Sequence, residues 1–183
     1  MLKHASASDA AIKAASNFKC AICESRKGPK LVRPISVPTH VEPFRVLQMD
    51  VKCLPSWIKE EKIACLNIVC EGSSLQQMGP FFVNESSAVL RDTYRNIWSR
   101  PYGRRARVVK FDAARTNLGQ LFVDQLEQDG AKVLDAAGQV HEDVGKAEVH
   151  GRWIEEIFTR MLDELQPTTK EQWVDCLDAA LEG

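Results

Sequence analysis

The sequence predicts an α/β protein in which a mixed five-stranded sheet carries helices on both faces. The first observation is the order of the segments: three strand-like runs follow one another, and the later strand-like runs are separated by helical ones. The second is the composition, because 44% hydrophobic and 27% charged residues over 183 positions are typical of one globular domain. No apolar run approaches the roughly 20 residues of a membrane helix, so we expect no membrane partner.

The N-terminal region is predicted to stand apart from the core. Residues 5–18 are alanine-rich and favour a short helix, with Ser8 as a plausible N-cap. A proline-rich connector, LVRPISVPTHVEP, follows and is incompatible with a helix. We therefore expect an N-terminal tail over 1–40, a core over 41–166 and a C-terminal helix over 167–183.

Three consecutive strands are predicted at the start of the core. FRVLQMDVKCL (44–54) alternates, with Leu47, Met49, Val51 and Cys53 on one face and the more polar set of Val46, Gln48, Asp50 and Lys52 on the other. KIACLNIVCEG (62–72) is β-branched and apolar, as expected of a more buried strand. MGPFFV (78–83) contains a proline, which favours an edge or irregular position. The short turns between them favour an antiparallel meander.

Helices and strands then alternate. We expect a helix over 86–100, begun by Ser86 or Ser87, and a strand over 105–112. A second helix is predicted over 116–130, ended by Gly130, and a short strand over 131–136.

Two helices are predicted to close the chain. KAEVHGRWIEEIFTRMLDEL (146–165) is amphipathic, and its apolar stripe consists of Ile154, Ile157, Phe158, Met161, Leu162 and Leu165. After Pro167, Thr169 and Gln172 have the spacing of a capping box. The apolar positions that follow, Trp173, Cys176, Leu177, Ala180 and Leu181, keep helical spacing.

Charge and cysteine usage bear on the partner and the compartment. The net charge is −1, yet residues 1–49 hold eight Lys/Arg against three Asp/Glu, and residues 141–183 hold four against eleven. Arg100, Arg104 and Arg105 form a further basic cluster, which fits either phosphate contacts or a solvated helix end and loop. The six cysteines are scattered and the N-terminus lacks the apolar core of a signal peptide, so we expect an intracellular protein with reduced thiols.

Three acidic residues stand where their side chains can meet. Asp50 lies on the polar face of the first strand, Asp112 ends the fourth, and Glu148 is in the first turn of the long helix. If the first and fourth strands are neighbours, Asp50 and Asp112 come together, and Glu148 can face the sheet. Clustered carboxylates repel each other, and two Mg²⁺ ions about 3.5–4 Å apart would remove that repulsion and permit phosphoryl transfer.

Each acid also has a purely structural interpretation. Asp50 can be a solvated strand residue, Asp112 an Asx-turn, and Glu148 a residue favoured by the helix dipole. The three together, rather than any one of them, indicate a metal site.

Three segments that contain these acids resemble a known family. FRVLQMDVKCLP, VVKFDAART and GKAEVHGRWIEEIF resemble the acidic blocks of retroviral and retrotransposon integrases, and 35 residues separate Asp112 from Glu148, as is typical there. The resemblance covers about residues 18–165 and implies a ribonuclease-H-like fold with Mg²⁺ or Mn²⁺ bound by Asp50, Asp112 and Glu148. It implies metal-dependent DNA 3′-processing and strand transfer, DNA and further copies of the chain as partners, a nuclear location and an origin in a retroelement polyprotein.

Two further sets of residues follow from the resemblance. Arg100, Arg104, Arg105, Lys146 and Arg152 would make sequence-independent phosphate contacts. Cys20 and Cys23 resemble one end of the integrase N-terminal zinc module and would supply two of the four Zn²⁺ ligands, with His4 a possible third. We expect a truncated module and a partial zinc site.

Alternatives remain open. Ala113, Ala114 and Arg115 replace the neighbours that usually follow the second acid, and Val149 stands where the family usually has an arginine after the glutamate. These differences, the partial zinc module and the low net charge favour a repurposed domain that binds nucleic acid or protein without catalysis. A metal-dependent nuclease of the same fold is a third interpretation.

Overall fold

The structure of the protein is a computed structural model that describes residues 41–103, 106–111, 119–135 and 145–182, with Ser8, Ala10 and Lys13 near the N-terminus. The chain divides into two compact units, Met1–Ser36 and Val37–Gly183, and the strands and helices described here belong to the second. Most of the helix predicted over 5–18 lies outside the described residues. The three-part division predicted from the sequence remains a prediction.

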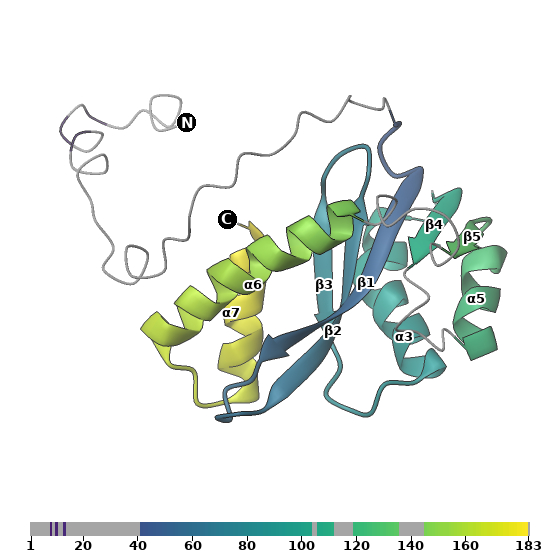
Figure 1. Ribbon diagram of the computed structural model, residues 1–183. Helices are drawn as coiled ribbons and strands as arrows, with labels where there is room; N and C mark the ends of the chain where they lie inside the picture. The colour runs from purple at the N-terminus through teal and green to yellow at the C-terminus, as the bar shows by residue number, and fades with distance from the viewer. Residues whose placement is uncertain are drawn as a thin grey trace. The chain divides into compact units, whose positions relative to one another are not determined.

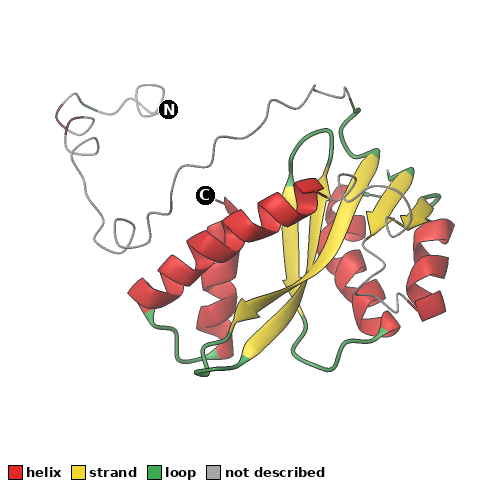
Figure 2. Cartoon of the chain, in the orientation of Figure 1, coloured by secondary structure: helices red, strands yellow, loops and turns green. Residues whose placement is uncertain are grey.

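Five strands form one mixed sheet (Figures 1 and 2). They are β1 (Val46–Pro55), β2 (Lys62–Cys70), β3 (Gln76–Pro80), β4 (Val108–Phe111) and β5 (Lys132–Asp135), in the spatial order β3-β2-β1-β4-β5. The first three pair antiparallel, and β4 and β5 join parallel to β1 and to each other. The mixed sheet, the meander and the pairing of the first strand with the fourth are therefore confirmed.

Strand β3 differs from its prediction in its boundaries. We predicted residues 78–83, whereas the strand begins at Gln76 and ends at Pro80. Gln76 and Gln77 pair with Val69 and Ile68 of β2, so two polar residues extend the strand at its start. Pro80 is tolerated there because β3 occupies the sheet edge, as predicted, and the Phe81 N–H that follows still donates to the Ala64 carbonyl of β2 at 2.7 Å.

Helices cover both faces of the sheet (Figure 1). One layer comprises α3 (Ser87–Tyr94), the π-helical η1 (Arg95–Ser99), α4 (Arg100–Tyr102) and α5 (Gly119–Gln128). The other comprises α6 (Gly145–Leu165) and α7 (Lys170–Glu182). Each layer has its own core: Leu47, Met49 and Val51 of β1 pack with the first layer. Leu54 of β1 packs with α6 and α7.

Local sequence explains where the first-layer helices begin and end. The Ser86 hydroxyl accepts a hydrogen bond from the Val89 N–H at 3.3 Å, as an N-cap does. Gly130 has φ +85°, and its N–H and that of Ala131 donate to the carbonyls of Glu127 and Leu126. This Schellman ending confirms the predicted glycine stop.

The helix predicted over 86–100 is not uniform, because residues 95–99 adopt π-helical geometry. Pro101 lies just beyond and cannot donate to the Ile97 carbonyl, which its ring would also crowd in an α-helix. A wider turn relieves that conflict, and the Arg100 N–H accordingly donates to the Arg95 carbonyl.

The two C-terminal helices also differ in detail from their predictions. Ile154 and Phe158 of α6 are buried as expected, but Ile157 and Leu165 are 39% and 59% exposed. Ala147 and Gly151 continue the buried stripe toward the N-terminus instead. In α7 the Thr169 hydroxyl caps the Gln172 N–H, while the Gln172 side chain accepts from the Thr168 N–H rather than from Thr169.

The buried face of α7 is as predicted, with Trp173, Cys176, Leu177 and Ala180 in the core. Among the described residues, no helix combines the length and the apolar character needed to cross a membrane.

Candidate active site

The face of β1 that carries Asp50 lies beneath α6. Strand alternation puts Gln48, Asp50 and Lys52 on one side of the sheet. Gln48 and Lys52 both contact α6, so this is the side that α6 covers. Asp50 is half-buried between them, and its partner on β2 is Asn67. The predicted polar face is therefore a helix-covered face and not a solvated one.

The first turn of α6 is hydrogen-bonded to the sheet. The Ala147 N–H donates to Oε1 of Gln48 at 3.0 Å, and Nδ2 of Asn67 donates to the Ala147 carbonyl at 3.0 Å. Gly151, one turn further on, lies so close to β2 that a Cβ built there would be 3.2 Å from Nδ2 of Asn67. A glycine at this position lets the helix approach the strand that closely.

A second contact between α6 and β1, in addition to that of Ala147 with Gln48, determines the direction in which the helix runs along the strand. Nζ of Lys52 forms an ion pair with Oε2 of Glu155 at 2.8 Å. Glu148 precedes Glu155 by two helical turns, so both lie on the same side of α6. Because Ala147 contacts Gln48 and Glu155 contacts Lys52, α6 runs along β1 in the direction from Gln48 to Lys52, and Glu148 follows the residue that contacts Gln48. Glu148 is exposed, which leaves its carboxylate accessible.

The turn that follows β2 adds a charged contact at the same end of α6. Nζ of Lys146 donates to the Glu71 carbonyl at 2.5 Å. Nζ of Lys110, on β4, lies 3.3 Å from Oε2 of Glu71, a charge contact without hydrogen-bond geometry. Both side chains of this pair are about one-fifth exposed, so Glu71 links α6, β2 and β4 in a largely buried position.

The third predicted acid cannot be placed in this geometry. Strands β1 and β4 pair as far as Met49 and Phe111, the residues just before Asp50 and Asp112. Asp112 itself lies outside the described residues, as do Arg104, Arg105, Cys20 and Cys23. Within the ranges that the structure describes, no group of three His, Cys, Asp or Glu side chains could hold a metal ion.

The predicted phosphate-binding residues are not all brought together. Arg152 is exposed and lies four residues after Glu148, on the same side of α6. Lys146 is half-buried and engaged with Glu71. Arg100 follows η1 in the opposite helix layer, where its guanidinium donates to Oδ1 of Asn96 at 2.7 Å. The sheet therefore separates Arg100 from the α6 cations.

Sequence reasoning missed the buried amides that position α6. Gln48 is 3% exposed and Asn67 is 0% exposed, and Nε2 of Gln76 donates to Oδ1 of Asn67 at 2.7 Å. One signal was present, because Asn67 interrupts the apolar run KIACLNIVC, where an unpaired amide would be costly. Its partner could not be inferred, since Ala147 is 80 residues away.

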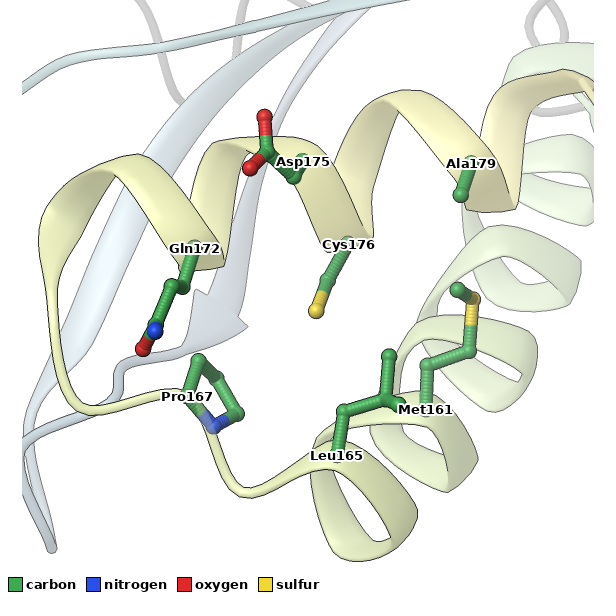
Figure 3. Close-up of a pocket in the computed structure, with 7 residues that line it drawn as sticks. All are labelled: Met161, Leu165, Pro167, Gln172, Asp175, Cys176 and Ala179. Carbon is green, nitrogen blue, oxygen red and sulfur yellow. The ribbon is translucent and has the colours of Figure 1, made fainter.

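A separate cavity lies at the other end of α6 (Figure 3). It has a volume of about 280 Å³ and opens between the last turns of α6 and the first half of α7. Met161, Leu165 and Pro167 supply its apolar wall, and the Cys176 side chain extends toward it. Burial, and secondarily the Asp175 carboxylate, raise the pKa of the Cys176 thiol, so the thiol stays protonated at neutral pH. This cavity is remote from Glu148 along the helix.

Solved structures of retroviral integrases share this fold. The integrase catalytic core domain of HTLV-2, in complex with magnesium and in a dimeric form, matches with a TM-score of 0.63 at 15% identity, over 78% of this chain and 87% of that chain. A simian T-cell lymphotropic virus intasome in complex with the PP2A regulatory subunit B56 gamma gives 0.67 at 13% identity, over 98% of this chain and 65% of that chain. The catalytic core domain of BIV integrase gives 0.59 at 13% identity, over 75% and 81%.

These similarities confirm the ribonuclease-H-like α/β fold of integrase cores. No protein-family model and no curated protein matches the chain.

Proposed function

We propose that this chain is an integrase-like polynucleotidyl transferase that carries out metal-dependent DNA 3′-processing and strand transfer. The observation that carries the proposal is the docking of the first turn of α6 on β1. It holds the start of the helix that carries Glu148 against the face of β1 that carries Asp50, in a fold shared with retroviral integrase cores. This docking supports a site to which both carboxylates contribute.

The residues fit a hard divalent cation. Mg²⁺ prefers oxygen ligands and is usually held by one or two carboxylates together with water and substrate phosphates. The half-buried Asp50 and the exposed Glu148 supply carboxylate oxygens and leave room for both, and Asp112 would be the third ligand. A bound metal pair would supply charge neutralisation and Lewis-acid stabilisation of the phosphoryl oxygens. A magnesium complex of a structural neighbour supports the choice of cation.

DNA is the proposed substrate. Arg152, exposed one turn after Glu148, is suited to contact a phosphate next to the scissile one. Lys146 would reach the backbone only by leaving the Glu71 carbonyl. Structural neighbours that are dimeric or part of an intasome support a homo-oligomer acting on DNA ends, which would place the protein in the nucleus.

A strand-transfer assay with Mg²⁺ or Mn²⁺ tests the proposal. We expect activity in the wild type and a loss of more than about 100-fold in Asp50→Asn, Asp112→Asn and Glu148→Gln, because each removes several kcal/mol of transition-state charge stabilisation. Glu156→Gln, at an exposed position of the same helix, is the matched control and should keep wild-type activity. In the same samples, Mn²⁺ should raise the melting temperature of the wild type and not that of Asp50→Asn.

Two outcomes would contradict the proposal. Activity that survives all three substitutions would locate the chemistry elsewhere. DNA binding without activity in any sample, and without stabilisation by Mn²⁺, would favour the non-catalytic binding domain.

A further inference from the structure

The backbone of Ala147, one residue before Glu148, is held by two buried side-chain amides. Gln48 accepts from its N–H and Asn67 donates to its carbonyl, each at 3.0 Å. Ala147 and Asn67 have no exposed surface, and Gln48 is 3% exposed. Both polar groups of one helical residue are thus fixed by side chains that are 99 and 80 residues away in the sequence.

Helix physics explains what this arrangement achieves. The first N–H groups of an α-helix have no partner within the helix, and that of Ala147 is the third in α6. A local N-cap residue normally satisfies such a donor and leaves the helix free to shift as a body. Here the acceptor belongs to β1, so the bond that caps the helix also ties its first turn to the sheet.

The orientation of the Asn67 amide is itself determined by a hydrogen bond. Its Oδ1 accepts from Nε2 of Gln76 on β3 at 2.7 Å, which turns Nδ2 toward the Ala147 carbonyl. Gly151 leaves Asn67 the space that this orientation needs. Leaving a buried amide unpaired costs about 1–3 kcal/mol. The side chains of Gln48, Asn67 and Gln76 and the backbone of Ala147 therefore hold each other in a single arrangement.

The same two residues adjoin Asp50. Gln48 precedes it by two residues on the same face of β1, and Asn67 is its partner across the β1–β2 ladder. Glu148 follows the residue that they hold. Any movement of Ala147 relative to Gln48 and Asn67 therefore changes the separation of Asp50 and Glu148.

We propose that Gln48 and Asn67 are positioning residues. By hydrogen-bonding the backbone of Ala147, they fix the position of Glu148 relative to Asp50, an inference that rests on the proposed function. They touch neither metal nor DNA in this role. Their effect is to keep the first turn of α6 from fraying, so that the two carboxylates stay at the separation that a shared cation requires.

The test compares four purified full-length chains: wild type, Gln48→Met, Gln48→Glu and Gln125→Met. Gln48→Met keeps the length of the side chain and removes the acceptor, whereas Gln48→Glu retains an acceptor for the Ala147 N–H. Gln125→Met is the matched control, because Gln125 donates to Oδ1 of Asp129 at 2.9 Å within the opposite helix layer. Circular dichroism verifies that each variant is folded.

Two measurements are made on each chain. Hydrogen exchange reports the protection of amides at residues 145–151, and isothermal titration with Mn²⁺ reports metal affinity. We expect Gln48→Met to lose protection in this segment and to bind Mn²⁺ about tenfold more weakly, as when a group that orients a ligand is removed. Gln48→Glu should recover the protection, and Gln125→Met should match the wild type in both measurements.

The outcomes separate this inference from the proposed function. If wild type and Asp50→Asn bind Mn²⁺ equally or not at all, the proposed function fails and the positioning role fails with it. If Mn²⁺ binding depends on Asp50 but Gln48→Met retains wild-type affinity or wild-type protection, the positioning role alone is overturned. If Gln125→Met lost as much Mn²⁺ affinity as Gln48→Met, the loss would reflect general destabilisation, and the positioning role would again be overturned.

Discussion

Two tryptophans show how differently the same residue type contributes to this fold. Trp173 is fully buried, its Nε1 donates to the Pro55 carbonyl at 2.8 Å, and its ring meets Phe158 edge-on with centroids 5.0 Å apart. Trp153 lies on α6 with 39% of its surface exposed, beside His150. The first joins α7 to the end of β1, and the second lies on the surface.

Trp173→Phe should therefore destabilise the protein much more than Trp153→Phe. The first substitution removes a hydrogen bond to the half-buried Pro55 carbonyl and opens a cavity around Phe158, for an expected loss of about 2–3 kcal/mol in the free energy of unfolding. The second should cost less than about 0.5 kcal/mol. Urea denaturation measures both, and equal losses would contradict the assigned role of Trp173.

Asp178 is a residue whose charge opposes folding. Asp178 is exposed, but partial loss of hydration around its carboxyl, and then the carboxylates of Asp175 and Glu182, raise the pKa of that carboxyl above the ordinary value. An acid whose pKa is raised on folding lowers stability at neutral pH. The penalty disappears as the pH falls below the ordinary pKa of about 3.9, where the group is protonated in both the folded and the unfolded chain.

Asp178→Asn should accordingly raise the melting temperature at pH 7 by about 1–3 °C, a small effect because the side chain is exposed and screened. The difference from the wild type should vanish near pH 3. Thermal unfolding at both pH values measures it. A gain that is the same at pH 3 would mean that the substitution acts through packing rather than charge.

Among the elements, α6 makes different kinds of contact along its length. Its first three turns contact the sheet through Ala147, Gly151 and the Glu155 carboxylate, with hydrogen bonds and an ion pair. From Ile154 onward, Ile154 and Phe158 pack into the core shared with α7. The polar contacts determine where the start of the helix lies relative to β1, and the apolar contacts join the rest of it to α7.

Two glycine-to-alanine substitutions in α6 distinguish the gain in helix propensity from the cost of crowding between α6 and β2. Gly145→Ala, where an added Cβ meets nothing within 4 Å, should stabilise the protein by up to about 1 kcal/mol. Gly151→Ala has the same propensity gain, but its Cβ would lie 3.2 Å from an Asn67 nitrogen that the Ala147 carbonyl holds in place. We expect a net loss of about 1 kcal/mol, because overpacking costs about 1–3 kcal/mol.

Denaturant unfolding of the two variants gives the comparison. If Gly151→Ala stabilises as much as Gly145→Ala, the contact between α6 and β2 is looser than the distance indicates.

At the scale of the whole molecule, the sheet divides the polar groups between two helix layers. The carboxylates of Asp50 and Glu148, with Arg152 and Lys146, belong to the α6 side. Arg100 belongs to the other layer. A DNA segment that lies across the proposed site would therefore contact α6 first, and Arg100 would serve a different strand, a different copy of the chain or no DNA at all.

Local pattern was sufficient for most of the architecture. Alternation in residues 44–54 predicted that Leu47, Met49 and Val51 share a face, and they enter the first core, although Cys53 on the same predicted face is exposed. The Ser86 cap and the Gly130 stop marked helix ends. The condition under which Asp50 and Asp112 could approach each other, that the first and fourth strands are neighbours, holds in the structure. These features depend on residues close together in the sequence, so periodicity and capping rules are sufficient to predict them.

The sequence by itself thus determined the order of the elements and the mixed sheet, whereas the metal site of Asp50, Asp112 and Glu148 stays a prediction. Only the tertiary structure decided that the polar face of β1 is covered, that Gln48 and Asn67 grip Ala147, and that Arg100 lies on the far side of the sheet. The physical reason is the distance along the sequence between the residues that interact. A buried amide must find a partner, but which backbone group it finds, 80 or 99 residues away, depends on how a helix and a strand pack, and no local pattern encodes that choice.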